Sequence, residues 1–439
     1  MLDKFRKGTQ VLSIPIRNSQ DDRDARRRRK ACPDRRREPS AAANRGAVAR
    51  AARTRRLLEG PIGPTLARLA APNVIAMLVM TAMSIAEGAY AGRLGVSSLA
   101  GLALVFPLVM LTQMLSAGAM GGAISSAVAR SLGAGDADRA GRVVVAAWII
   151  GLVAAGLSAL IILLFGEAIF RALGGGTDAV GEALAYAHVF FPGCVALWLC
   201  HSTLSVIRGS GDMATPSLVL LLVSAAAIPL AGAFALGWGP FPALGMAGLG
   251  AGPVVAFGIG AAAALVYVAT GRAGVRPTLR GLGWAEFRDI LRVGVFASLN
   301  TMQTVFTTVV MVALVGRYGE AALAGYGLGA RLEFLMVPIV FGVGAAMTAM
   351  VGANIGAGQK ARALRVGWTG SCAAAAIVGG VGLLVAVAPD LWLRLFLAAD
   401  ATATLEAGRA YFRIAGPFYG LFAIGLALYF ASQGAGRMF

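Results

Sequence analysis

Long apolar segments follow one another along the chain, separated by short polar connections. Since a membrane-spanning helix needs about 20 predominantly apolar residues, each segment is long enough to cross a bilayer. The pattern predicts an all-α polytopic membrane protein. The predicted spans are 66–91, 99–128, 143–165, 184–206, 215–238, 245–269, 293–315, 322–352, 366–388 and 408–431.

The connections between these spans alternate in charge. Every second connection is rich in arginine or lysine, whereas acidic residues offset the few arginines of the others. Positively charged connections favour the cytoplasmic side of a membrane. We therefore expect the N-terminus and the basic connections to face the cytoplasm, with the chain in a bacterial inner membrane. The basic connections hold Arg130, Arg139 and Arg142, then Arg208, then Arg272 to Arg292, then Lys360, Arg362 and Arg365.

One of these basic connections occurs twice. Its first copy contains Gly133, Gly135 and Arg139, and these residues recur in the second half of the chain as Gly356, Gly358 and Arg362. A second pair of connections, Arg208–Gly211 and Gln433–Gly436, matches in the same way. Repeats this long predict a duplicated helical bundle. Six spans in a repeat is an even number, so the two bundles should be related by a pseudo-twofold axis along the membrane normal.

The repeats define the predicted domain organisation. Residues 1–60 form a basic tail, 61–269 a first lobe of six spans, 270–292 a linker, and 293–439 a second lobe. The second lobe ends at the counterpart of the connection after the fourth span, so only four of its six helices are present. We interpret this as a C-terminal truncation. The linker is amphipathic around Trp284, Phe287 and Ile290, which predicts a helix on the inner membrane surface.

Composition agrees with a membrane protein and narrows the function. Only 14% of the residues are charged and the mean hydropathy is +0.74, whereas soluble domains are about 25% charged. The net charge of +18 is concentrated in residues 1–59, which hold 18 Lys and Arg against 7 Asp and Glu. Without aromatic residues or a folded scaffold beside them, these charges favour a disordered cytoplasmic tail near anionic lipid over a nucleic-acid site.

No pattern in the sequence indicates an enzyme. It contains no phosphate-binding Walker sequence, no zinc-ligand spacing and no Ser/His/Asp set. We therefore expect no cofactor and no metal. Transport by such a chain would draw its energy from an ion gradient.

Glu87 is the outstanding polar residue of the first predicted span. A carboxylate inside a membrane helix is costly, so it normally faces the bundle interior or a water-filled cavity and marks a transport pathway. Loss of water favours its neutral form, which would let it exchange a proton. The alternative is an acid at the membrane interface. Tyr90 lies on the same helix face and could share a cavity with Glu87. Pro72 is either a first-turn proline or a bend that responds to Glu87.

The second half has two charges within a predicted span, Arg331 and Glu333. Residues two apart on a helix do not face each other, so each needs a different partner. A structural ion pair with a neighbouring helix and a substrate site are both compatible with this spacing. Phe334 and Tyr326 could line a pocket for flat cations, although ordinary helix packing would also explain them.

The sequence resembles the multidrug and toxic compound extrusion (MATE) transporters from about Leu66 to Phe439. The resemblance rests on the doubled Gly-Ala-Gly connections, on Arg208–Pro216, on Val351–Gly356 and on the first-span pattern Thr81–Gly92. It implies two six-helix lobes and export of amphipathic organic cations. It also implies that Glu87 stands where the family usually has a cation-binding aspartate, with Pro72 at the position of a bend proline.

Departures from the family pattern shape the expected mechanism. One branch of the family adds an Asn and an Asp in the fifth helix, but the corresponding places here, near Ala227 and Ala231, are apolar. The acids that another branch carries in the seventh and tenth helices are also absent. Coupling would then rest on Glu87 nearly alone, which favours a proton over sodium, because sodium needs several oxygen ligands.

We therefore expect a monomeric, proton-coupled antiporter that works by alternating access of two lobes. One rival is a flippase for lipid-linked precursors, which would need a cavity rich in Arg and Lys. The sequence offers it only Arg331 at membrane depth. The other rival is an inactive, truncated membrane protein.

Overall fold

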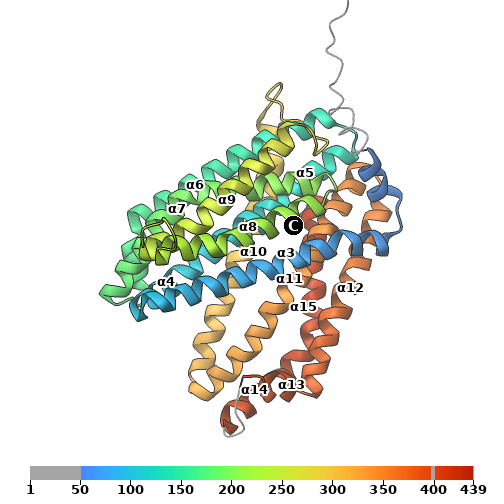
Figure 1. Cartoon of the computed structure of the whole chain (residues 1–439). Coiled ribbons are helices and arrows are strands. Elements are labelled where there is room, and N and C mark those ends of the chain that lie inside the picture. Colours follow the sequence, from blue (N-terminus) through green and yellow to red (C-terminus); the bar gives the residue numbers. More distant parts are fainter. Residues whose placement is uncertain (1–50, 397–400, 439) are drawn as a thin grey trace, which may run out of the picture. The chain divides into compact units, whose positions relative to one another are not determined.

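The computed structural model describes residues 51–396 and 401–438 of the chain (Figure 1). Within these residues, ten helical segments are long and apolar enough to cross a membrane, in agreement with the ten predicted spans. The first lobe holds α3 (Ile62–Leu94), α4 (Val96–Gln113) continued by a π-helix (Met114–Met120) and α5 (Gly121–Gly133), α6 (Ala137–Ala172), α7 (Thr177–Gly209), α8 (Ala214–Leu236) and α9 (Gly245–Ala269).

The second lobe continues from α10 (Trp284–Gly316) through α11 (Glu320–Gly356) and α12 (Lys360–Val387). It ends with a short α13 (Asp390–Leu393), then α14 (Thr402–Ala415), which a 3-10 turn joins to α15 (Tyr419–Ala435). The all-α, two-lobe architecture that the sequence predicts is confirmed.

Each lobe has its own apolar core, and each core includes the entry segment of the other lobe. The core of the first lobe takes in Ile290 and Val293 from the start of α10. The core of the second lobe takes in Leu66 and Leu69 from the start of α3, together with Leu57. The first helices of the two repeats thus exchange their first turns, since α3 contacts α11 of the second lobe and α10 contacts α5 of the first.

The predicted tail and linker differ from the structure where this exchange occurs. Residues 1–50 lie outside the described residues, but residues 51–59 form a helix, and its Leu57 is buried in the core of the second lobe. The amphipathic stretch of the linker is no separate surface helix, since Trp284 begins α10, which continues to Gly316. Its carboxylates Glu286 and Asp289 form ion pairs with the first lobe, which holds these turns in place.

The doubled glycines bring the two lobes into backbone contact. At Gly133, at the end of α5, a methyl group would overlap the carbonyl oxygen of Ala353 in α11. At Gly356, at the end of α11, a methyl group would overlap the carbonyl oxygen of Arg130 in α5. The crossing is therefore reciprocal, as a pseudo-twofold relation requires, and it depends on residues without a Cβ atom.

The next glycine of each copy has a different role. Gly135 and Gly358 have φ angles of 79° and 76°, in the left-handed region that glycine adopts without strain. They allow the chain to reverse from α5 into α6 and from α11 into α12. After the first of these turns, the Asp136 side chain accepts a hydrogen bond of 2.8 Å from the backbone N–H of Arg139 and caps α6.

The close crossing predicts that an added methyl group lowers the stability of the folded protein at one glycine and not at another. Gly133→Ala should destabilise the folded protein by about 1–3 kcal/mol, because the added atom overpacks a backbone contact that cannot move aside easily. Gly156→Ala is the matched control, because a Cβ atom added to that glycine of α6 would lie in open space. Thermal unfolding of the purified protein in detergent would measure both. Equal unfolding temperatures for the two variants would contradict the close crossing.

Candidate functional site

Glu87 lies inside the first lobe. Its exposed fraction is 7%, and Oε1 has no hydrogen-bond partner among the described residues. Buried Met83 and Ala91 stand one turn to either side on α3. The Tyr186 hydroxyl of α7 is close enough to interact electrostatically with it. This position fits a carboxylate that faces the bundle interior.

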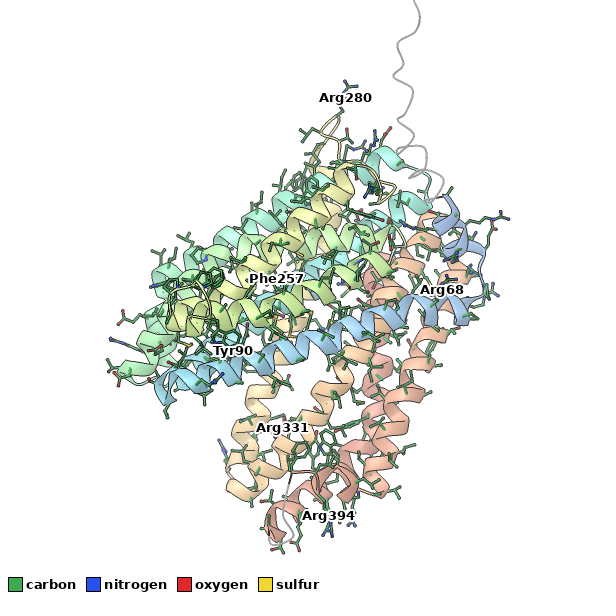
Figure 2. The ribbon with its side chains drawn as sticks, viewed as in Figure 1. Arg68, Tyr90, Phe257, Arg280, Arg331 and Arg394 are labelled. Carbon is green, nitrogen blue, oxygen red and sulfur yellow. The ribbon has the colours of Figure 1, made fainter. Side chains whose placement is uncertain are left out.

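Tyr90 packs against an aromatic neighbour one turn beyond Glu87. Its ring meets that of Trp238 edge-on, with centroids 5.6 Å apart. Gly232 of α8 makes room for the pair, since a methyl group there would stand 2.7 Å from the Trp238 ring and 3.0 Å from that of Tyr90. Tyr90 is half-buried at the edge of the first lobe's core, where its ring is held by packing, and a cavity shared with Glu87 stays a prediction. Figure 2 labels its place on α3.

Close helix packing fills the places where one branch of the family has polar residues. Ala227 and Ala231 of α8 are buried, and the Gly252 backbone of α9 lies directly against Ala231. In the part of the chain that the structure describes, no group of three His, Cys, Asp or Glu residues could hold a metal ion. Among these residues, Glu87 is therefore not part of a cluster of three such side chains that could hold a metal ion.

Pro72 lies within α3, well past its first turn, because the helix begins at Ile62. The first-turn interpretation is therefore wrong. A proline in a helix interior cannot donate the backbone hydrogen bond to the carbonyl four residues earlier, here that of Arg68, and this weakens the helix locally. A bend that responds to Glu87 stays a prediction.

Arg331 and Glu333 of α11 have different partners, as their spacing requires. The Arg331 guanidinium lies over the Phe396 ring, 5.8 Å from its centroid, and is exposed (Figure 2). Glu333 is half-buried and accepts a hydrogen bond from the Tyr411 hydroxyl of α14. Among the described residues, neither Arg331 nor Glu333 therefore forms the alternative, an ion pair with a neighbouring helix.

Tyr326 completes a small aromatic cluster around Glu333. Its ring meets Tyr411 edge-on, with centroids 5.6 Å apart. The side chain of Phe334 lies outside the part of the chain that the structure describes. Tyr411 could not be predicted as a site residue from the sequence, because nothing in the spacing along the chain relates it to Glu333.

Another acid in the second lobe is unsuited to carrying a proton near neutral pH. Asp390, at the start of α13, accepts hydrogen bonds of 2.7 Å from Nε and Nη2 of Arg409, and Arg394 adds a third. Chiefly through the Arg409 hydrogen bonds, these guanidinium groups hold the pKa of Asp390 at about 2.

The basic connections contact the entry segment of the opposite lobe. Arg130 Nη2 lies 2.6 Å from Asp289 Oδ1, and Arg139 Nη2 lies 3.2 Å from Asp289 Oδ2. Arg142 Nε is paired with Glu286 Oε1 at 2.7 Å.

The second copy of the connection also contacts the entry segment of the opposite lobe, but through hydrogen bonds. Asn354 Nδ2 donates to the Leu57 carbonyl at 3.1 Å, and Arg362 donates to the Gly60 carbonyl. The doubled residues therefore join the lobes on one side of the bundle.

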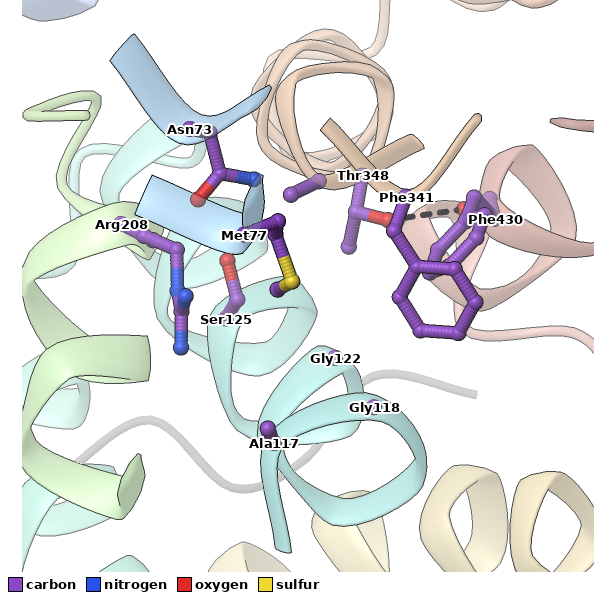
Figure 3. A pocket seen from close by; sticks show the side chains of 12 residues that line it. Asn73, Met77, Ala117, Gly118, Gly122, Ser125, Arg208, Phe341, Thr348 and Phe430 are labelled. Carbon is purple, nitrogen blue, oxygen red and sulfur yellow. Dashed lines mark hydrogen bonds between the residues drawn. The ribbon is translucent and has the colours of Figure 1, made fainter. Parts of the chain in front are cut away.

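A small cavity lies where the lobes meet (Figure 3). Its volume is about 30 Å³. The first lobe contributes Asn73, Ser125 and Arg208, and the second contributes Phe341, Thr348 and Phe430. From the sequence, Arg208 is recognisable only as part of a basic connection, and no pattern there singles out Asn73 or Ser125.

The repeated lobes, the buried carboxylate and the cavity between the lobes define a polytopic membrane transporter. The family model MatE matches residues 72–232 and 297–438, and the chain belongs to this family. Members of the family are transporters, and the chain is not an enzyme. It is similar to multidrug transporters, and the expected resemblance is confirmed.

Curated relatives and solved structures show the extent of this likeness. A FAD transporter of Shewanella oneidensis is 24% identical over 70% of this chain and 68% of its own length. A probable multidrug resistance protein NorM of Thermotoga maritima is 26% identical over 85% of this chain and 80% of its own. An outward-facing structure of a multidrug resistance MATE family transporter has a TM-score of 0.76 and 25% identity, covering 87% of this chain and 85% of that one.

The ion pairs between the lobes predict a measurable loss of stability. Asp289→Asn should destabilise the protein by about 1–3 kcal/mol, because the Arg130 guanidinium, only 14% exposed, loses its charged partner. Glu59→Gln makes the same chemical change in an exposed pair with Arg55 and should have no measurable effect. Unfolding in detergent compares the two. A loss no larger for Asp289→Asn than for the control would show that this pairing does not join the lobes.

Proposed function

We propose that this transporter is a proton-coupled antiporter that exports amphipathic organic cations by alternating access of its two lobes. The observation that carries the proposal is the isolation of Glu87, which is buried in the first lobe with Oε1 unpartnered. A carboxylate without hydrogen-bond donors or a paired cation is suited to hold a proton and poorly suited to hold sodium, which needs several oxygen ligands.

The coupling follows from competition for one negative charge. A protonated Glu87 is neutral and attracts no cation. Once it releases the proton, its charge in a low-dielectric interior favours binding of an organic cation to the transporter. A proton that enters from outside would displace the cation, and its release inward would prepare the carboxylate for the next one. The proposed coupling needs no cofactor.

The packing between the lobes indicates which stage of this transport cycle the structure represents. The contacts of Gly133 with Ala353 and of Gly356 with Arg130 lie beside the basic connections. If the basic connections face the cytoplasm of a bacterial inner membrane, as their charge favours, this stage is closed to the cytoplasm.

The aromatic cluster of the second lobe supplies groups that suit a flat cation. Glu333 offers negative charge, and the rings of Tyr326 and Tyr411 offer faces that attract cations. We assign this cluster a part in substrate binding, with the proton carried by Glu87.

A second candidate function is export of a flavin dinucleotide. The observation that favours it is the likeness to the FAD transporter of Shewanella oneidensis. Such a substrate is an anion, so it would not compete with a proton for Glu87 in the manner described above.

Transport in inverted membrane vesicles tests the role of Glu87. A cationic dye should enter vesicles that carry the wild-type chain under an imposed proton gradient, but not under a sodium gradient. Glu87→Gln should abolish this uptake, because it cannot release a proton. Glu167→Gln is the matched control, since that acid is exposed beside Arg171, and it should transport normally. Undiminished uptake by Glu87→Gln would refute the proposal, and gradient-driven uptake of FAD alone would favour the second candidate.

Removal of the charge at Glu333 should change substrate binding more than coupling. Glu333→Gln should raise the KM for the dye about 3- to 10-fold, the range of a cation's interaction with such a site. The requirement for a proton gradient should persist. Initial rates over a range of dye concentrations measure the effect. Loss of gradient dependence with an unchanged KM would instead assign the coupling role to Glu333.

A further inference from the structure

The cavity between the lobes contains buried polar groups without partners. Asn73 is 1% exposed, and neither Oδ1 nor Nδ2 of its amide has a hydrogen-bond partner among the described residues. The Ser125 hydroxyl, in a residue 4% exposed, is also unpartnered. Both residues line the same cavity (Figure 3). Buried polar groups are nearly always satisfied, so these indicate an occupant.

Arg208 brings a positive charge to this cavity. It is 5% exposed, and the hydrogen bond described for its guanidinium is the one from Nη2 to the neutral Ser205 hydroxyl, at 3.1 Å. No carboxylate forms an ion pair with it among the described residues. Asp212, four residues further on, is paired with Arg53 at 2.9 Å and accepts hydrogen bonds from Thr215 and Tyr267. A buried cation without a counter-charge is costly, so an anionic occupant would be stabilising.

The second repeat does not balance this charge. Gln433 stands at the position that corresponds to Arg208. Its amide nitrogen donates to the carbonyls of Gly118 and Ala119, at 3.3 and 3.0 Å, across the lobe interface. Where the duplicated lobes face each other, one therefore supplies a positive charge and the other a neutral amide.

We propose that this cavity binds one small monovalent anion of halide size. Arg208 supplies the charge, and the Asn73 amide and the Ser125 hydroxyl donate hydrogen bonds. A volume of about 30 Å³ has room for about two waters or one such ion. This site is separate from Glu87, which lies further along α3 in the first lobe.

The anion would favour one conformation of the transporter. The cavity walls come from α3, the π-helix Met114–Met120, α5 and α7 of the first lobe and from α11 and α15 of the second. The site is complete only while the lobes are closed on the side of the basic connections. A ligand that binds one state stabilises that state in proportion to its differential affinity. The anion therefore acts as a counter-charge that holds the lobes together.

Binding of radiolabelled chloride to the full chain in detergent tests the site, with sodium gluconate keeping the ionic strength constant. The wild type should bind about one chloride per chain, displaced by bromide or nitrate and not by gluconate. Arg208→Gln should weaken binding about tenfold or more, because a charged hydrogen-bond donor is lost. Arg365→Gln, which removes an exposed arginine from another basic connection, should bind as the wild type does.

Asn73→Leu provides a second test if Arg208→Gln fails to fold. It retains the charge and removes one donor, so binding should weaken several-fold. Glu87→Gln should bind chloride normally, which separates this proposal from the coupling mechanism. No saturable chloride binding by the wild type would mean that water alone occupies the cavity. Equal loss in Arg208→Gln and Arg365→Gln would mean non-specific attraction to basic groups. Either result overturns the proposal.

Discussion

The reciprocal contact between α5 and α11 is the constraint on which the rest of the structure depends. Gly133 lies on the Ala353 carbonyl and Gly356 lies on that of Arg130, so the two lobes meet through backbone atoms. In a membrane, lipid is as apolar as the helix surface, and association relies on close packing and on hydrogen bonds. Side chains larger than glycine at these two positions would separate the helices and weaken both the close packing and the hydrogen bonds.

The position of the polar groups follows from that contact. With α5 and α11 so close, Arg130 can reach Asp289 at the start of α10, and Asn354 can reach the Leu57 carbonyl. The same approach encloses Arg208, Asn73 and Ser125 between the lobes. Glu87 stays apart from this interface within the first lobe, which lets its charge change without opposing the ion pairs that join the lobes.

Much of the fold could be predicted from the sequence because each span is one continuous apolar segment. The repeat of Gly133 and Gly135 at Gly356 and Gly358 also revealed the two lobes. The exchange of first turns could not be predicted, because the amphipathic pattern near Trp284 suits a surface helix as well as the start of a span. The place of Glu87 in the lobe interior followed from the cost of a carboxylate in lipid. The neighbours of Glu333 and Arg208 did not follow, since Tyr411 and Asn73 are distant from them in the chain.

The central claim, that one carboxylate exchanges a proton for an organic cation, can be measured without a membrane. A cationic drug would be added to the purified protein in weakly buffered detergent solution near neutral pH, with a pH indicator present. The account predicts that binding releases up to one proton per chain, so the pH falls, and that Glu87→Gln binds without releasing any. Release of the same number of protons by Glu87→Gln, or drug binding by the wild type with no release at any pH near neutrality, would contradict it.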